Sequence, residues 1–165
     1  MTRAVWDEES YLDLVRRACF ICEMLAGNPD YPHHVAHRDE RAVVFLSRFP
    51  FMWGHLLVAP VEHREHVIGD FPLDDYLALQ RVVHAAGTAL TAAVPTERLY
   101  LLSFGSQQGN RHTHWHLAPL PPGVPYEHQQ FAAFSAALGP YDFPERDLAH
   151  LAAELGRRLR EIFVD

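Results

Sequence analysis

The sequence contains no lysine, only two cysteines and no long apolar run. The lack of lysine excludes a P-loop lysine, a Schiff-base lysine and a Ser–Lys dyad. Two cysteines cannot build a disulfide framework. Because the longest apolar runs are only as long as a β-strand, we expect no segment that spans a membrane. The first ten residues are acidic and lack the apolar core of a secretory signal, so we expect a cytoplasmic protein.

Positive charge is also scarce, since the net charge is −7. Proteins that bind nucleic acid or anionic membranes broadly carry excess positive charge, so neither partner is expected. A chain of 165 residues with 48% hydrophobic content is long enough to bury one core. Histidine is abundant, with twelve residues, several of them in clusters. We therefore expect the chemistry of this protein to depend on histidine.

The order of periodic segments predicts an α+β fold with an antiparallel sheet. Apolar residues recur every three or four positions along residues 73–93, which predicts a long amphipathic helix. Further helices are expected over residues 11–26, 126–138 and 144–163. Strands are expected over residues 35–37, 42–46, 55–60, 99–104 and 112–117.

Three histidines alternate at His112, His114 and His116. Alternate side chains of a β-strand point to the same face, so the three imidazoles should form one row. A neutral imidazole nitrogen, available near pH 7, can attack phosphorus and later leave. Such a row favours nucleotidyl transfer through a covalent phosphohistidine. A metal site alone, or a polar exposed face, would give the same spacing.

The stretch His-Thr-His-Trp-His-Leu-Ala at 112–118 resembles the signature of the histidine-triad (HIT) superfamily of nucleotide hydrolases and transferases. Residues 45–60, which contain a Gly-His pair and end in proline, resemble a second segment of that family. The resemblance covers residues 19–119 and implies a HIT-like antiparallel sheet with a long helix. It leaves residues 1–18 as an N-terminal extension and 120–165 as a C-terminal helical extension.

The resemblance implies roles for four histidines. His114 would be the nucleophile that attacks the α-phosphate and holds the nucleoside monophosphate. His112 and His116 would orient its ring and bind phosphate oxygens, and His55 would be the family's fourth histidine. A capping or surface position is the alternative for His55. The reaction would need no catalytic metal and no organic cofactor.

A polar loop over residues 105–110 leads into the triad, and its glycines would let backbone N–H groups approach phosphate. Gln108 matches the family's glutamine, and Asn110 is a further donor. The family's Ser or Thr after that glutamine is glycine here, which weakens the case for amidated substrates. Ser47 stands where many members hold the ribose with Asp or Asn. Phe45 and Phe49 could line a base pocket or belong to the core.

Cys19 and Cys22 form a C-x-x-C pair, which alone is half of a zinc site, a redox pair or two buried thiols. Many bacterial histidine-triad proteins carry C-x-x-C at this place. The resemblance adds His63 and His112 as ligands, with His66 as an alternative to His63. Two thiolates and two imidazoles would make a closed, structural zinc site.

The sequence thus predicts a hydrolase that cleaves a dinucleoside polyphosphate or a nucleoside phosphoramidate at the α-phosphate. The same fold could act as a phosphorylase or nucleotidyltransferase, with phosphate as the acceptor. A non-catalytic nucleotide-binding module and a protein that only binds metal are the remaining alternatives. Since family members commonly form homodimers, Trp53 and Trp115 are candidates for an apolar dimer contact.

Overall fold

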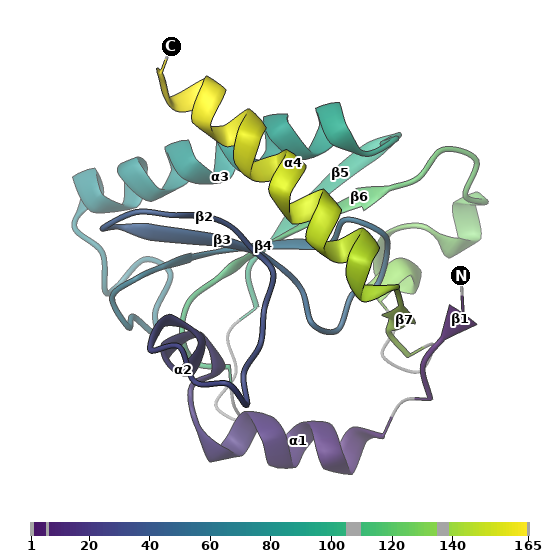
Figure 1. Ribbon diagram of the computed structural model, residues 1–165, viewed down its shortest axis with the longest axis horizontal. Helices are drawn as coiled ribbons and strands as arrows, with labels where there is room; N and C mark the ends of the chain where they lie inside the picture. Colours follow the sequence, from purple (N-terminus) through teal and green to yellow (C-terminus); the bar gives the residue numbers. More distant parts are fainter. Residues whose placement is uncertain (1, 6, 105–109, 135–138, 165) are drawn as a thin grey trace.

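A five-stranded antiparallel sheet forms the centre of the molecule, with the strand order β2-β3-β4-β6-β5 (Figure 1). The computed structural model describes residues 2–5, 7–104, 110–134 and 139–164. The strands are β2 (Val35–Arg38), β3 (Ala42–Leu46), β4 (Leu56–Pro60), β5 (Arg98–Leu102) and β6 (Trp115–Leu120). The predicted α+β class with an antiparallel sheet is therefore confirmed.

Two long helices, α3 (Leu73–Ala93) and α4 (Glu145–Val164), cover one face of this sheet (Figure 1). Alternate residues of β3 point toward them, among them Val44, while Leu155 and Leu159 of α4 join the same core and are fully buried. Full burial of one such side chain contributes roughly 1.5–3 kcal/mol. The C-terminal helix therefore forms part of the central core.

The opposite face carries two smaller apolar clusters. Helix α2 (Phe20–Leu25) covers β3 and β4 there, with Ile21 buried against Val43 and Phe45. Next to it, Met52 and the β6 residue Leu120 pack beneath the 3-10 turns η1 (Tyr126–His128) and η2 (Gln130–Phe134). The histidine site lies on this face of the sheet.

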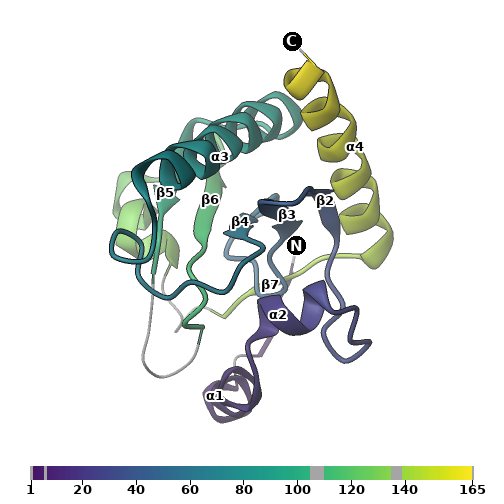
Figure 2. The same cartoon turned by 90° about the vertical axis from the view of Figure 1, so that its left-hand side faces the viewer.

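Helix α1 (Glu8–Arg17) lies beyond α2, on the side of the molecule away from α3 and α4 (Figure 2). All ten of its residues are described, and none is fully buried. The short strands β1 (Thr2–Arg3) and β7 (Tyr141–Asp142) pair with each other, which joins the N-terminus to the segment before α4. Within the described residues, no helix is long and apolar enough to cross a membrane.

Three expectations from the sequence were wrong. The helix expected over 11–26 is two helices, because Cys19 is extended and its Sγ accepts the backbone N–H of Cys22 as the cap of α2. The described part of the helix expected over 126–138 is two 3-10 turns separated by Gln129, and Gln130, which begins the second turn, has a positive φ. The strand expected over 112–117 begins only at Trp115, since the Thr113 N–H donates to the Arg64 carbonyl instead of a neighbouring strand.

One suggested dimer contact is also wrong. Trp115 is 5% exposed and packs under α3 against Phe71 and Tyr76, so it is not available to a partner. The side chains of β6 alternate, and Trp115 and Leu117 both face α3. For the same reason His116, which lies between them, faces the opposite side of the sheet.

Candidate active site and metal cluster

His114 is held in one tautomer by the backbone beside it. Its Nδ1 lies 2.7 Å from the carbonyl oxygen of His112, and because a carbonyl can only accept, Nδ1 carries the proton. Nε2 is therefore the unprotonated nitrogen. Burial lowers the pKa of His114, partly opposed by this hydrogen bond, so the ring is neutral at pH 7. A neutral ring with a free lone pair on Nε2 is a competent nucleophile.

A second pair of histidines is oriented by a chain of hydrogen bonds. The Phe51 N–H donates to Nδ1 of His55 at 3.4 Å, so the His55 proton is on Nε2. That Nε2–H donates to Nδ1 of His116 at 3.0 Å, which leaves the His116 proton on its own Nε2. His116 therefore retains one N–H donor beside His114, since the two ring centroids lie 4.8 Å apart.

His55 and His116 are both kept uncharged by their surroundings. Burial, with a smaller contribution from His114, lowers the pKa of His55 to about 3. Burial, together with His114 and His55, lowers the pKa of His116 to about 2. The pair is therefore neutral at pH 7, and each proton position follows from the hydrogen bonds alone.

His112 differs from the other triad members because both of its ring nitrogens are engaged. Nε2–H donates to the Pro60 carbonyl at 2.9 Å, so Nδ1 carries the lone pair. Nδ1 faces the thiols, 3.5 Å from Cys19 Sγ and 3.6 Å from Cys22 Sγ. With its ring fully buried, His112 contacts His114 through its carbonyl oxygen, and its ring belongs to the cysteine cluster.

Cys19, Cys22, His63 and His112 present one ligand atom each within 4.8 Å of one another. The Cys22 Sγ to His63 Nδ1 distance is 3.3 Å. Thiolate and imidazole ligands of a tetrahedral zinc, at about 2.3 Å and about 2.0–2.1 Å from the metal, lie roughly 3.5 Å from each other. The donor set and its spacing therefore fit zinc. His66 is not part of this cluster within the described residues.

The outer hydrogen bonds of the cluster also fit a metal site. Nε2–H of His63 donates to the Glu65 carboxylate at 3.3 Å, and that of His112 donates to a backbone carbonyl. Both imidazoles thus offer Nδ1 to the centre, with the other nitrogen held as in most metal-ligating histidines. Burial and the neighbouring Cys19 raise the pKa of the Cys22 thiol to about 12, so metal uptake has to release its proton.

A cavity of about 80 Å³ lies over His114 and His116. Aromatic side chains form much of its wall, namely Tyr11, Phe20, Tyr31, His33 and Phe49. Planar walls of this kind suit a planar ligand, because aromatic rings stack favourably with one another. The cavity therefore combines a neutral nucleophile with an aromatic lining.

Comparison with known proteins finds similar chains and folds. No protein-family model matches the sequence. An uncharacterized HIT-like protein of Saccharolobus solfataricus is 27% identical over 104 residues, which cover 61% of this chain and 73% of that protein. The fold superposes on a hypothetical histidine triad nucleotide-binding protein of Sulfolobus tokodaii with a TM-score of 0.68 and 21% identity, over 87% of this chain and 93% of the other.

The chain has the fold of histidine-triad proteins and is similar in sequence to a HIT-like protein. A zinc-bound histidine triad family protein of Mycobacterium smegmatis shares the fold, with a TM-score of 0.66 and 20% identity over 89% of this chain and 96% of that one. The likeness to both solved structures spans most of this chain.

Only some of the residues expected to bind substrate line the cavity over His114. Phe49 and Asn110 line the cavity over His114. Phe45 is fully buried behind it, where it packs against the Phe20 and His33 rings. Ser47 is not among the described residues that line the cavity, and its Oγ accepts the Phe49 N–H at 3.2 Å. Gln108 lies outside the described residues.

Several lining residues of the histidine-triad site were not predicted. Tyr31, His33 and Arg48 come from loops, where the sequence carries no periodic signal. Tyr11, Leu14 and Val15 of α1 show an apolar stripe at spacings of three and four, which predicts a buried face but does not say what it covers.

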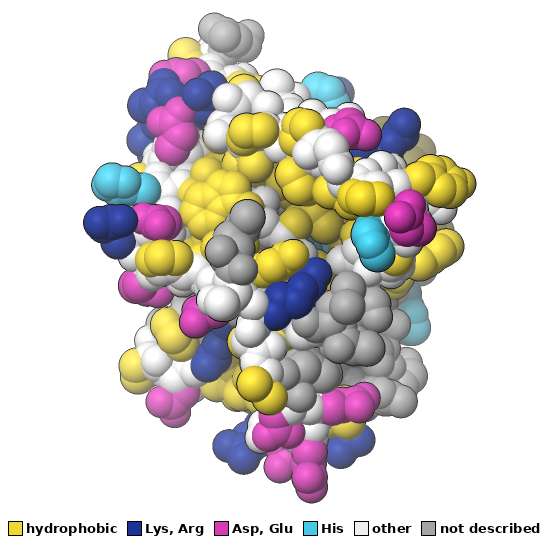
Figure 3. All heavy atoms as spheres, turned by 90° about the vertical axis from the view of Figure 1, so that its right-hand side faces the viewer, with side chains coloured by type: hydrophobic (Ala, Val, Ile, Leu, Met, Phe, Trp, Pro, Cys, Tyr) yellow, Lys and Arg dark blue, Asp and Glu magenta, His cyan; other side chains and the backbone are white. Residues whose placement is uncertain are grey.

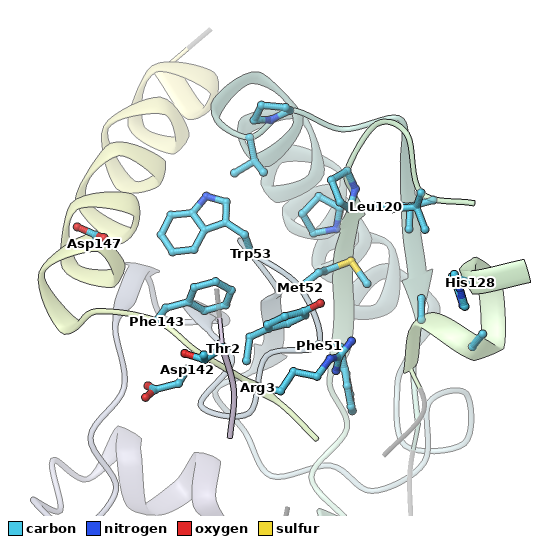
Figure 4. A pocket seen from close by; sticks show the side chains of 18 of the residues that line it. Thr2, Arg3, Phe51, Met52, Trp53, Leu120, His128, Asp142, Phe143 and Asp147 are labelled. Carbon is cyan, nitrogen blue, oxygen red and sulfur yellow. The ribbon is translucent and has the colours of Figure 1, made fainter. Parts of the chain in front are cut away.

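A larger cavity, of about 1330 Å³, opens elsewhere on the molecule, where apolar side chains surround a hollow (Figure 3). Trp53, Phe143, Met52 and Leu120 line it (Figure 4), and no triad histidine is among its described lining residues. Phe51 and Met52 connect it to the histidine site, because the Phe51 ring lies against the His55 imidazole and the Met52 carbonyl accepts the His55 backbone N–H at 3.2 Å. The smaller cavity, by contrast, has His114 and His116 in its wall.

Proposed function

We propose that this protein hydrolyses a dinucleoside polyphosphate or a nucleoside phosphoramidate at the α-phosphate, through a nucleotidyl group held covalently on His114. The observation that carries this proposal is the tautomer of His114. Its protonated Nδ1 is tied to the His112 carbonyl, and its free Nε2 belongs to a ring that lines an aromatic cavity. The aromatic lining suits a nucleobase, and the Sulfolobus tokodaii relative is described as a nucleotide-binding protein.

In the first step, the Nε2 lone pair of His114 attacks the α-phosphorus, and the bond from phosphorus to the leaving group breaks. The new N–P bond makes the ring cationic, because Nδ1 keeps its proton. The His112 carbonyl, 2.7 Å away, stabilises this positive charge. The remaining N–H of His116, whose ring also lines the cavity, can donate to a phosphate oxygen.

In the second step, water attacks the same phosphorus, loses a proton and releases the nucleoside monophosphate. The electron pair of the N–P bond returns to Nε2, which restores the neutral ring. A leaving nucleoside polyphosphate departs as an anion and needs no proton, whereas a leaving amine has to be protonated. Because the described histidines of the site are neutral, we favour dinucleoside polyphosphates over phosphoramidates.

We propose that Cys19, Cys22, His63 and His112 hold a structural zinc. When bound, zinc supplies folding free energy by joining segments that are distant in sequence. His112 then has its ring in the cluster and its carbonyl on the nucleophile. The ring position of His114 therefore depends on the order of the cluster, although no chemical step involves the metal.

The proposal is tested by incubating the purified protein with diadenosine polyphosphates and with adenosine phosphoramidate. Release of AMP by the wild-type protein, lost by at least about a thousandfold in His114→Ala, is the expected result. Added inorganic phosphate that diverts the product to ADP would identify a phosphorylase instead. Turnover that survives in His114→Ala would contradict the assignment of the nucleophile.

A further inference from the structure

Helix α1 forms one wall of the cavity that contains His114. Tyr11, Leu14 and Val15 line this cavity, and their spacing of three and four places them on one face of the helix. The other face of α1 is charged and exposed, with Asp13 among its residues. The apolar residues of α1 therefore cover the histidine site and are not part of the central core.

Tyr11 joins this wall to two other parts of the site. The Asn110 side-chain amide donates to the Tyr11 hydroxyl at 2.8 Å. The Tyr11 ring meets the Phe49 ring edge to face, with centroids 5.3 Å apart. Burial raises the pKa of Tyr11, so the hydroxyl stays protonated at neutral pH. Both contacts are to residues that line the same cavity.

The cavity over His114 is smaller than a typical small-molecule site. Its volume is about 80 Å³, whereas small-molecule sites typically measure on the order of 300 Å³ or more. Helix α1 can move more easily than the wall formed by the sheet, because none of its ten residues is fully buried, whereas Leu57 of β4 is only 4% exposed. Only Ala18 separates its last residue from Cys19 of the metal cluster. The helix is therefore anchored at its C-terminal end, and the rest of it is weakly packed.

We propose that α1 is a movable wall of the substrate site and that Tyr11 contacts the bound nucleotide. This inference rests on the proposed function, because it takes a nucleotide as the ligand. The hydrogen bond from Asn110 to Tyr11 holds the wall against the pocket. Binding of the nucleotide displaces the helix outward, and the Tyr11 ring then packs on the ligand.

The test measures AMP binding by calorimetry and stopped flow in the full chain. Tyr11→Ala removes the ring, so AMP should bind about tenfold more weakly. Tyr11→Phe keeps the ring but removes the acceptor for Asn110, so the association rate should rise severalfold. Asp13→Ala, on the exposed face of the same helix, should change neither quantity by more than about twofold. Hydrogen exchange of α1 amides should also change when AMP is added.

The outcomes separate this inference from the proposed function. Equal AMP affinity and equal α1 exchange in Tyr11→Ala and the wild type overturn the role of α1 alone. If the wild type binds AMP but forms no adduct on His114, the proposed reaction is wrong, while the proposed role of α1 still holds. A wild type that binds no AMP overturns both. Melting curves of Tyr11→Ala show whether it is folded, and Tyr11→Phe provides an independent result if it is not.

Discussion

The neutral pair His55–His116 should make the folded protein unstable toward acid. In the folded state the pKa of His55 is lowered to about 3, chiefly by burial, from an ordinary value of 6.5. Between these two pH values the unfolded chain binds a proton that the folded chain does not. The free energy of unfolding therefore falls as the pH falls below 6.5, and it is fully regained above that value.

The size of this effect follows from the same linkage. For one histidine that titrates only when unfolded, the free energy of unfolding drops by about 2 kcal/mol between about pH 7.5 and about pH 5.0. His55→Gln removes that titration, while the glutamine amide can still donate to Nδ1 of His116. The wild type should thus lose about 2 kcal/mol more than His55→Gln over this range.

Urea unfolding of both proteins at the two pH values measures this quantity directly. Contributions from the other histidines and from the metal cluster are shared by the two proteins, so they cancel in the difference. A difference in unfolding free energy that is the same at both pH values would refute the reasoning. It would mean that His55 is protonated or hydrated in the folded state, and the proton positions assigned to His116 would then fail as well.

Two further predictions concern the metal cluster and the packing of α4. Elemental analysis should find about one zinc per chain. The double variant Cys19→Ser, Cys22→Ser should lose both the metal and several degrees of Tm. Zinc-free wild-type protein with an unchanged Tm would contradict the site. A Cβ at Gly156 would lie 2.5 Å from the Ala36 carbonyl oxygen of β2. Gly156→Ala should therefore lower the unfolding free energy measured in urea. The same change in an exposed helix would raise it by about 1 kcal/mol. An increase in the unfolding free energy of Gly156→Ala would show that α4 shifts without cost.

Strong periodicity made the central elements predictable. The apolar stripe of residues 73–93 corresponds to α3 with the same bounds, and the short apolar runs correspond to β3 and β4 within about one residue. Cys19 and Cys22 lie together with His63 and His112, as expected. This grouping was predicted from the resemblance to the histidine-triad family, since no local sequence pattern links residues so far apart.

The parts that could not be predicted depend on tertiary contacts. Helical periodicity runs on past Arg17, but the thiol of Cys19 caps a new helix and turns toward the cluster. Alternation at the triad suggested three equivalent rings, whereas the buried His112 points at the thiols and only His116 lies within β6. The apolar stripe of α1 gave no indication of its target, since Asn110 and Phe49 are distant in sequence.

The most direct test of the account is to locate the covalent intermediate. The protein is mixed with an adenosine 5′-phosphate ester of a good leaving group, quenched within milliseconds, digested and examined by mass spectrometry. The account predicts one adenylyl group on the peptide that contains His114, bonded through nitrogen, labile in acid and discharged when water is allowed to react. An adduct on His116 or His55, or burst-free turnover with no adduct on any histidine, would contradict it.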